Sequence, residues 1–466
     1  MKLLARLNTF PILFALAALS FIPTLFYFYV GEEGVFTLNS MEMWQRHEYL
    51  STVLYGTSGA GGTGRPPLFN WLMIPIANLI EWENVLVAAR IVTVTATVTT
   101  SLIIAWLAQQ LWRDKTTSWV ASILYLVTVD IMLDHGWQSY ADPLFAMFTV
   151  LAISQAWVAC QRNSYPLLIF ALIAAFAAFL TKAFTVYLFL GISMLVLMVD
   201  SNFRRFLLNP RAWVIYMLGA LLPFVWLQLG THDAAQHAKM SNDMVEKLGI
   251  LNVGDYIKRL LVYPMEMFLR LMPSSFFIAY LWVRQRENVW QYSAVRMSLL
   301  IALANFLPYL IAPQGGVRYV IPVFAFVALA AAYLVVKKSS PFKIKKWIVV
   351  MLGIGLVARV VIIPYYQMLI RGENYAQMAS EILIKYGHIP LYVSNVTAVG
   401  LSVVAYIDSM RINHPALTFP PVDFKEGIVI AHSATEVPGT LLRELRNHGV
   451  SIYLICRGAA CEAAKN

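Results

Sequence analysis

The chain has 466 residues, of which 59% are hydrophobic and only 13% are charged. Soluble domains usually contain about 25% charged residues, and the mean hydropathy of this chain is +0.65. These values exclude a soluble globular enzyme, a disordered protein and a nucleic-acid-binding domain, because the surplus apolar residues must face lipid. The net charge of +10 then reflects basic loops that fix the orientation in a membrane. Three cysteines exclude a disulfide scaffold and a multi-cysteine metal site.

About eleven apolar stretches are long enough to be membrane-spanning helices, so the predicted fold class is an α-helical polytopic membrane protein. A helix needs about 20 apolar residues to cross a hydrocarbon core of ~30 Å. The stretches 165–181 and 183–199 could also form one long helix, so the predicted number of spans ranges from roughly 9 to 13. The expected spans cover residues 10–30, 85–111, 117–133, 143–160, 165–181, 183–199, 212–229, 263–283, 294–312, 319–336 and 347–369.

The basic residues lie in alternate loops, which indicates the orientation of the chain. Short loops rich in Lys and Arg stay in the cytoplasm. The N-terminus is then cytoplasmic, and an odd number of spans places the C-terminus outside. Residues 1–30 begin like a signal peptide but lack a small-residue cleavage site, so an uncleaved first span is expected. The largest outer segments are 31–84, 230–262 and 370–466, which favours binding or chemistry on the outer face.

The first outer loop contains residues suited to acid–base and phosphate chemistry. Glu32 and Glu33 follow the first span directly, and a carboxylate there can accept a proton from a hydroxyl nucleophile. Arg65 precedes Pro66 and Pro67, and an arginine on such a rigid turn can hold a phosphate through paired hydrogen bonds. The simpler interpretations are a solvated helix end for the carboxylates and an anchor to lipid headgroups for Arg65.

Two helices are expected within this outer loop. Residues 36–50 carry apolar side chains at seven-residue spacing, which predicts an amphipathic helix lying along the membrane interface. The glycine-rich segment 56–64 is interpreted as a flexible connector and not a P-loop, because no Gly-Lys-Ser or Gly-Lys-Thr follows it. Residues 68–80 are too short to span the membrane and are expected to form an outer interfacial or re-entrant helix.

Ionisable residues at or within apolar spans are functional candidates, because charge is costly in a membrane. Asp142, Lys182 and Arg318 each lie at the outer end of a predicted span. An outer cleft containing these charges would suit a phosphate leaving group and a hydroxyl acceptor. The alternatives are snorkelling to headgroups for the cations and a helix N-cap for Asp142. Arg90 and Arg359 fall inside apolar stretches, where each could be an ion-pair partner within the bundle.

The sequence does not predict a metal or another cofactor. His47 and His135 are isolated from other ligand-type residues. Glu32, Glu33 and Asp142 together could hold a divalent metal, but nothing in their spacing indicates one.

Taken in order, these motifs resemble those of the polyprenyl-phosphate-sugar-dependent glycosyltransferases of the GT-C class. That class includes the aminoarabinose transferases acting on lipid A and the protein O-mannosyltransferases. The motifs are an acidic pair after the first span, a basic residue before Pro-Pro-Leu, an Asp in the second outer loop, Leu-Thr-Lys, and Arg-Tyr-x-x-Pro opening a late span. The resemblance covers residues 1–340 in order and topology, and it implies a GT-C-type fold.

The resemblance also implies roles for individual residues. Glu32 and Glu33 match the acidic pair of the family, whose first member is the expected catalytic carboxylate, and Asp142 matches a second acidic position. Three departures are Glu for Asp at 32, Arg for Lys at 65 and Ala for Gly at 183, and the first leaves open which glutamate is catalytic. The positions implied to contact the donor phosphate are Arg65, Lys182, Arg318 and Tyr319.

The implied reaction is displacement, with inversion, at the anomeric carbon of a sugar linked to a polyprenyl phosphate such as undecaprenyl phosphate. Glu32 or Glu33 would deprotonate or orient an acceptor hydroxyl, while the cations stabilise the developing phosphate charge. A phosphate acceptor would need no base. The sequence does not identify the acceptor, which could be lipid A or another glycolipid, a cell-wall polymer or a protein hydroxyl. A bacterial inner membrane, with the active site on the periplasmic side, is the expected location.

Residues 370–466 differ in character and predict a small α/β domain on the outer face. We therefore expect a transmembrane catalytic region over 1–369, followed by this extracytoplasmic domain. Cys456 and Cys461 could form a disulfide there or stay as free thiols. Helical patterns at 374–386, 396–407 and 438–447 alternate with strand patterns at 389–395, 427–432 and 450–456.

Two other functions compete with the glycosyltransferase. A transporter or lipid flippase would show internal repeats or broken helices in matched halves, and no repeat is found in the sequence. A non-enzymatic binding or assembly protein would keep its function when Glu32 and Glu33 are both changed to Gln. The glycosyltransferase would lose its function in that variant without losing its fold.

Overall fold

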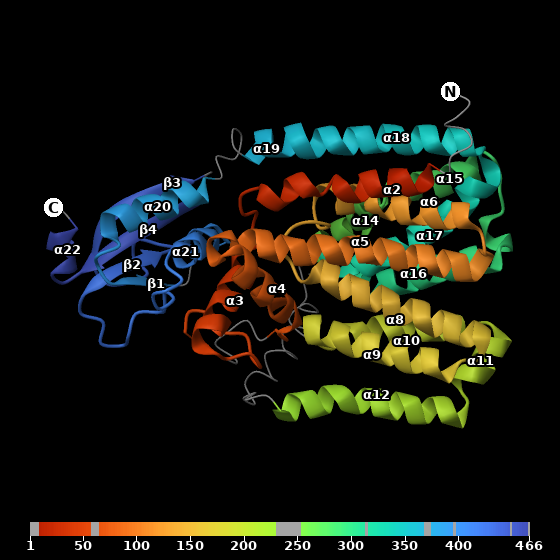
Figure 1. Cartoon of the computed structure of the whole chain (residues 1–466), viewed down its shortest axis with the longest axis horizontal. Coiled ribbons are helices and arrows are strands. Elements are labelled where there is room, and N and C mark those ends of the chain that lie inside the picture. The colour runs from red at the N-terminus through yellow and green to blue at the C-terminus, as the bar shows by residue number, and fades with distance from the viewer. Residues whose placement is uncertain are drawn as a thin grey trace.

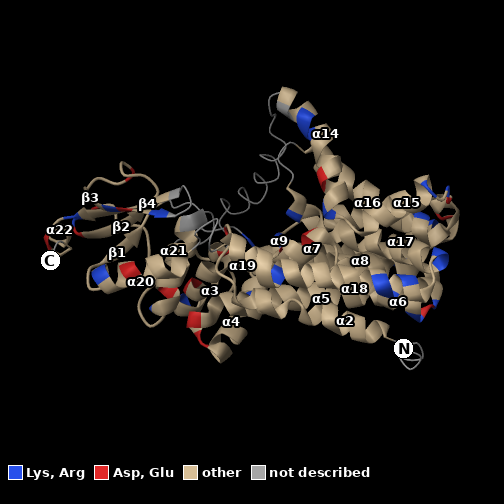
Figure 2. Ribbon diagram, turned by 90° about the horizontal axis from the view of Figure 1, so that it is seen from above, with Lys and Arg blue, Asp and Glu red and all other residues tan. Residues whose placement is uncertain are grey.

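The structure is a computed structural model that describes residues 9–56, 65–229, 253–312, 316–367, 374–394, 398–447 and 450–464. A bundle of helices makes up most of the molecule, and a small sheet with its own helices lies at one end of the bundle (Figure 1). We call this end of the bundle the sheet end, and the opposite end, near the N-terminus, the far end. Lys and Arg gather at the far end, where the predicted orientation places the cytoplasmic loops (Figure 2).

Among the described residues, seven helical stretches are long and apolar enough to cross a membrane. The chain is therefore a helical membrane protein, and shorter apolar helices complete its bundle. The long stretches contain α5 (Val85–Trp112), α8 (Asp142–Arg162), α9 (Tyr165–Lys182), α12 (Pro210–Leu229), α16 (Ser293–Ile311), α17 (Ile321–Lys338) and α18 (Pro341–Val357). The other bundle helices are α2 (Phe10–Leu19), α6 (Lys115–Leu126), α7 (Val129–Leu133), α10 (Thr185–Leu197), α11 (Ser201–Leu207), α14 (Val253–Arg270), α15 (Ser274–Val283) and α19 (Ile363–Tyr365). Short turns of tighter or wider helix are η1 (Ile22–Phe26), η3 (Trp82–Asn84), η4 (Val289–Gln291), η5 (Val317–Val320) and η6 (Ala358–Ile362).

Helix breaks divide some of the expected spans. The stretch 117–133 forms α6 and α7, and the stretch 263–283 forms the end of α14 and then α15. Pro273 lies at the second break, where its missing N–H ends the hydrogen-bond ladder. The expected stretches around residue 183 are two helices and not one, because Ala183 takes a φ of 55° that ends α9.

The two helices expected in the first outer loop are α3 (Gly34–Arg46) and α4 (Leu68–Ile80). The first was expected to be an amphipathic interfacial helix, but its polar face is not exposed, because α3 is buried over most of its length. It packs between α4 and α21 (Ala398–Met410), so closely that a Cβ on Gly34 would lie 2.7 Å from the carbonyl oxygen of Leu401. The polar side chains of α3, which suggested an exposed face, find hydrogen-bond partners inside the protein.

The C-terminal unit contains a four-stranded sheet in the order β1-β2-β4-β3. β1 runs parallel to β2, whereas β4 is antiparallel to both β2 and β3. Apolar strand residues on β2 are buried throughout, as expected for a central strand covered on both faces. The elements are α20 (Tyr375–Tyr386), β1 (Leu391–Val393), α21, β2 (Gly427–Ala431), β3 (Thr440–Asn447), β4 (Val450–Arg457) and α22 (Ala460–Ala463).

One predicted element of this unit is wrong, since residues 438–447 contain strand β3 and no helix. The spacing of leucines in this stretch suits a helix, but pairing with β4 satisfies the backbone of both strands and places Leu445 opposite Ile452. Cys456 and Cys461 form a disulfide. The predicted domain boundary after residue 369 falls within 368–373, outside the described residues.

Candidate active site

The two adjacent glutamates after the first span have different surroundings. Glu33 is completely buried and pairs with Arg90 of α5, with Nη2–Oε2 and Nε–Oε1 distances of 2.7 and 3.1 Å. Its oxygens also accept hydrogen bonds from the backbone N–H groups of Val30, at 2.6 Å, and Ser139, at 2.5 Å. All four contacts hold the Glu33 carboxylate in place and leave it no exposed surface.

Arg90 is also completely buried, and its pairing with Glu33 confirms the prediction that it forms an ion pair within the bundle. Besides Glu33, its guanidinium donates to the carbonyl oxygens of Thr24, Tyr27 and Phe28, at 3.1, 2.5 and 2.7 Å. It therefore fixes the chain where the first span ends. Arg359 differs, because it donates to the Met132 carbonyl oxygen at 2.8 Å and no carboxylate pairs with it among the described residues.

Glu32 faces the other way, toward solvent and positive charge. Gly31 before it has a φ of +57°, a conformation that glycine adopts without strain. The Glu32 backbone N–H donates to the Tyr140 hydroxyl at 3.1 Å. The side chain is 53% exposed, and its Oε2 lies 3.6 Å from Nη1 of Arg318. Of the two carboxylates, Glu32 is thus the one that a substrate can reach.

A buried ion pair lies beside Glu32. Lys182, the last residue of α9, bonds to Asp142, the first residue of α8, and only 20% and 8% of their side chains are exposed. The Lys182 ammonium also lies 4.0 Å from the ring centroid of Tyr319. The Arg318 guanidinium lies 5.4 Å from the same centroid, so both cations contact one tyrosine ring.

Arg65 completes this group of charges. Its guanidinium lies 5.0 Å from the ring centroid of Phe36, and its carbonyl oxygen accepts a hydrogen bond from the Thr52 hydroxyl at 3.1 Å. The Phe36 ring lies 6.1 Å from the Tyr140 ring, centroid to centroid, and the Arg318 guanidinium lies 5.6 Å from the same Tyr140 centroid. Of the connector 56–64, which was expected to be flexible, residues 57–64 lie outside the described residues.

The structure thus brings most of the predicted site residues to the sheet end of the bundle. We call this group the charged cluster, and its members are Glu32, Arg65, Tyr140, Asp142, Lys182, Arg318 and Tyr319. Tyr140 is the member that the sequence analysis did not find, and Glu33 is the predicted residue that does not join. The cluster has three cations and two carboxylates, an arrangement that can stabilise phosphate charge and accept a proton.

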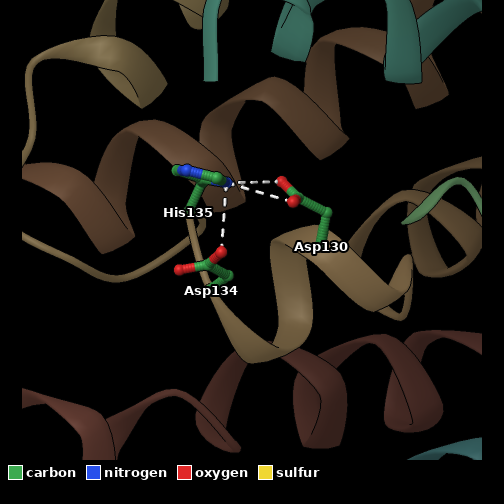
Figure 3. A group of neighbouring side chains, drawn as sticks. All are labelled: Asp130, Asp134 and His135. Carbon is green, nitrogen blue, oxygen red and sulfur yellow. Dashed lines mark hydrogen bonds and ion pairs between the residues drawn. The ribbon is translucent and has the colours of Figure 1, made fainter. Parts of the chain in front are cut away.

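A second group of polar side chains lies next to the cluster, and it corrects the prediction that His135 is isolated (Figure 3). The Nδ1 atom of His135 lies 2.9 Å from Asp130 and 3.6 Å from Asp134. Burial lowers the pKa of His135, but the hydrogen bond and charge of Asp130 outweigh burial and raise it above its usual value. Arg270 of α14 bonds both carboxylates, at 2.5 and 3.2 Å.

These three side chains have the right atoms for a metal site, because their ligand atoms lie within 4.8 Å of one another. The Arg270 guanidinium, however, already supplies a positive charge to Asp130 and Asp134. A cavity of about 580 Å³ opens between this group and Arg318, so it joins the charged cluster to α14. Arg270 lies far from Asp130 in the chain, and no sequence signal connected them.

Comparisons with known proteins confirm the resemblance that the motifs suggested. The family model of dolichyl-phosphate-mannose-protein mannosyltransferase matches residues 64–227. An undecaprenyl phosphate-alpha-4-amino-4-deoxy-L-arabinose arabinosyl transferase of Pseudomonas aeruginosa (strain UCBPP-PA14) is 31% identical over 172 residues. This match covers 36% of the chain and 30% of the relative, so it spans less than a third of the relative's length.

Solved structures share the fold over nearly the whole chain. ArnT from Cupriavidus metallidurans in the apo state has a TM-score of 0.71 at 12% identity, covering 97% of this chain and 98% of that one. The same protein bound to undecaprenyl phosphate has a TM-score of 0.72 at 13% identity, covering 98% and 99%. The chain is thus a helical membrane protein with an ArnT-like fold. In sequence it is similar to polyprenyl-phosphate-sugar-dependent glycosyltransferases of the GT-C class.

Proposed function

We propose that this chain is an integral-membrane glycosyltransferase that moves a sugar from a polyprenyl-phosphate donor to an acceptor on the outer face of the membrane. The observation that carries the proposal is the half-exposed Glu32 carboxylate facing Arg318 beside the buried Asp142–Lys182 pair. The ArnT-like fold supports it, because one ArnT structure is bound to undecaprenyl phosphate. The Pseudomonas aeruginosa relative supports the same class of donor.

In this proposal the cations of the charged cluster bind the donor phosphate. Arg65 and Arg318 are placed to form paired hydrogen bonds with it, and Lys182 adds a point charge. Asp142 holds the Lys182 ammonium in position, and the Tyr319 ring contacts both Lys182 and Arg318. The polyprenyl tail stays in the bilayer while its phosphate lies at the sheet end.

The chemical step is a displacement at the anomeric carbon. The acceptor oxygen forms a bond to this carbon as the bond from the carbon to the phosphate oxygen breaks, so the configuration inverts. When the acceptor is a hydroxyl of a lipid, glycan or protein, Glu32 takes its proton. The polyprenyl phosphate leaves as an anion, and the three cations stabilise the charge that develops on it. A phosphate acceptor arrives deprotonated, and Glu32 then orients it.

Separate substitutions of the two glutamates test this proposal. A deletion strain would be complemented with wild type, Glu32→Gln, Glu33→Gln or the matched control Glu48→Gln, an exposed carboxylate in the same outer loop. Mass spectrometry of lipids, envelope glycans and glycoproteins should show one species that loses a single sugar mass in the deletion and in Glu32→Gln. We expect transfer to be at least about 10²-fold slower in Glu32→Gln and normal in Glu48→Gln.

Other results would change the assignment. Full restoration of the glycosylated species by Glu32→Gln would show that the carboxylate has no part in the reaction. If no sugar changes in the deletion while the wild-type protein is expressed, a transporter or a binding protein becomes the better assignment. The mass of the affected species would also name the sugar and the acceptor.

A further inference from the structure

We propose that a groove at the far end of the bundle binds an anionic glycerophospholipid of the cytoplasmic leaflet. The groove is lined by α6, α15, α17 and α18 and has a volume of about 290 Å³. It lies at the opposite end from the charged cluster (Figure 1), so this proposal does not depend on the proposed function. It depends on the predicted orientation, in which the far end is cytoplasmic.

The inner wall of this far-end groove is apolar and closed. Leu124 of α6, Leu281 of α15 and Ile348 of α18 are only 2%, 4% and 2% exposed. Its outer rim is aromatic and open, since Phe276 and Trp347 are 51% and 57% exposed. Such a groove on the side of a membrane-spanning bundle faces hydrocarbon.

Polar residues line one part of the groove and supply the charge. Gln285, Lys338, Ser339 and Lys343 lie where α15, α17 and the start of α18 meet. Lys338 is neutralised by Glu287, with an Nζ–Oε2 distance of 2.5 Å. Lys343 is exposed in the first turn of α18. The groove therefore presents a net positive charge beside an apolar channel.

This combination matches the chemistry of an anionic phospholipid. Basic pockets between membrane helices on the cytoplasmic side bind anionic headgroups, and each nearby Lys strengthens the attraction. The lipid phosphate would contact Lys343, with Ser339 and Gln285 as hydrogen-bond donors. One acyl chain would lie along Trp347 and Phe276. A zwitterionic lipid carries its own cation and gains less from Lys343.

The headgroup contact is tested with two lysines of the same helix. Full-length wild type, Lys343→Gln and Lys346→Gln would be purified in detergent, and thermal unfolding would be followed during titration with phosphatidylglycerol or phosphatidylcholine. Lys346 is also exposed on α18 but does not line the groove. We expect phosphatidylglycerol to stabilise wild type and Lys346→Gln alike. Its apparent affinity should be about fivefold weaker for Lys343→Gln, the effect of one lysine charge.

The acyl-chain contact is tested with two tryptophans. Trp347→Ala removes part of the groove rim, whereas the control Trp213→Ala removes a tryptophan of similar exposure, 54%, from α12. Of these two tryptophan variants, only Trp347→Ala should weaken stabilisation by phosphatidylglycerol. Equal responses of Lys343→Gln and Lys346→Gln would overturn the proposal. Equal stabilisation of wild type by phosphatidylcholine and phosphatidylglycerol would also overturn it. If undecaprenyl phosphate stabilised the protein in a Lys343-dependent way and phosphatidylglycerol did not, the groove would have a different occupant.

Discussion

The carboxylates at the sheet end fall into a closed group and an open group. Glu33, Glu42 and Asp408 form the closed group: each is buried, and each accepts hydrogen bonds from backbone N–H groups. Glu32 forms the open group, because its side chain is half-exposed and faces the Arg318 guanidinium. The adjacent residues Glu32 and Glu33 show that two acidic side chains can be distinguished by whether protein donors already occupy the hydrogen-bond positions of their carboxylate oxygens. A carboxylate with filled sites supports the fold, and one with vacant sites can meet a substrate.

Each carboxylate of the closed group holds a segment near the packing of α3 against α21 or near the end of the first span. Glu42 on α3 accepts from the N–H groups of Tyr55 and Gly56, at 2.5 and 2.8 Å, and so holds the start of the segment that leads to Arg65. Burial raises the pKa of Glu42 despite these hydrogen bonds. Asp408 on α21, which packs against α3, accepts from the Leu417 N–H. These residues hold the surroundings of the charged cluster in place.

The largest expected effect is on the stability of the folded protein, and it should appear for the closed group and not for Glu32. Arg90→Met leaves Glu33 buried without its counter-charge, and breaking such a pair costs about 3–5 kcal/mol. Thermal unfolding in detergent, or the yield of folded protein in membranes, should therefore fall sharply in this variant. Glu32→Gln should unfold like wild type, since Glu32 is half-exposed. Equal unfolding temperatures for Arg90→Met and wild type would show that the Glu33–Arg90 pair does not support the fold.

A second effect concerns the Asp142–Lys182 ion pair of the charged cluster, which lies outside both groups. Lys182→Met removes the cation that bonds Asp142 while keeping a similar side-chain length. We expect sugar transfer to slow by about 10²–10³-fold, the usual loss when one preorganised charge is removed from a reacting anion. The double variant Lys182→Met/Asp142→Asn removes both charges, so it should recover stability without recovering transfer. Recovery of transfer in the double variant would mean that the pair is structural only.

The sequence predicted the charged cluster better than it predicted the closed group. Motif order and the alternation of basic loops placed Glu32, Arg65, Asp142, Lys182 and Arg318 on one face, and the structure places all five at the sheet end of the bundle. The motifs could not decide between the two adjacent glutamates. That decision depends on Arg90, which lies inside an apolar helix far along the chain, and periodicity carries no information about such a contact.

The errors have a similar physical cause. The sequence of helix α3 predicts a surface helix with one apolar face, because the helix that buries its other face, α21, lies in a distant part of the chain. Strand β3 reads as a helix because its pairing with β4 overrides local propensity. His135 is an exception, because Asp130 and Asp134 lie within five residues of it and were visible in the sequence; only Arg270 comes from a distant segment. Local pattern predicted where helices run, and contacts between distant segments decided which charges are free.

The last expected effect is a pH dependence of stability that comes from the closed group. Burial raises the pKa of Asp408 to about 7, with the nearby Glu42 charge adding to the shift, whereas an unfolded Asp titrates near ~3.9. Between these two values the folded state binds the proton more tightly than the unfolded state, so stability falls as pH rises from about 4 to 7. The slope from this residue is at most about 1.4 kcal/mol per pH unit.

Asp408→Asn cannot titrate, so its unfolding temperature should depend less on pH across this window and exceed that of wild type above pH ~7. Thermal unfolding of both proteins from pH 5 to 8 measures the difference. Parallel pH profiles would show that Asp408 is ionised in the folded protein and that the contact between α3 and α21 tolerates its charge.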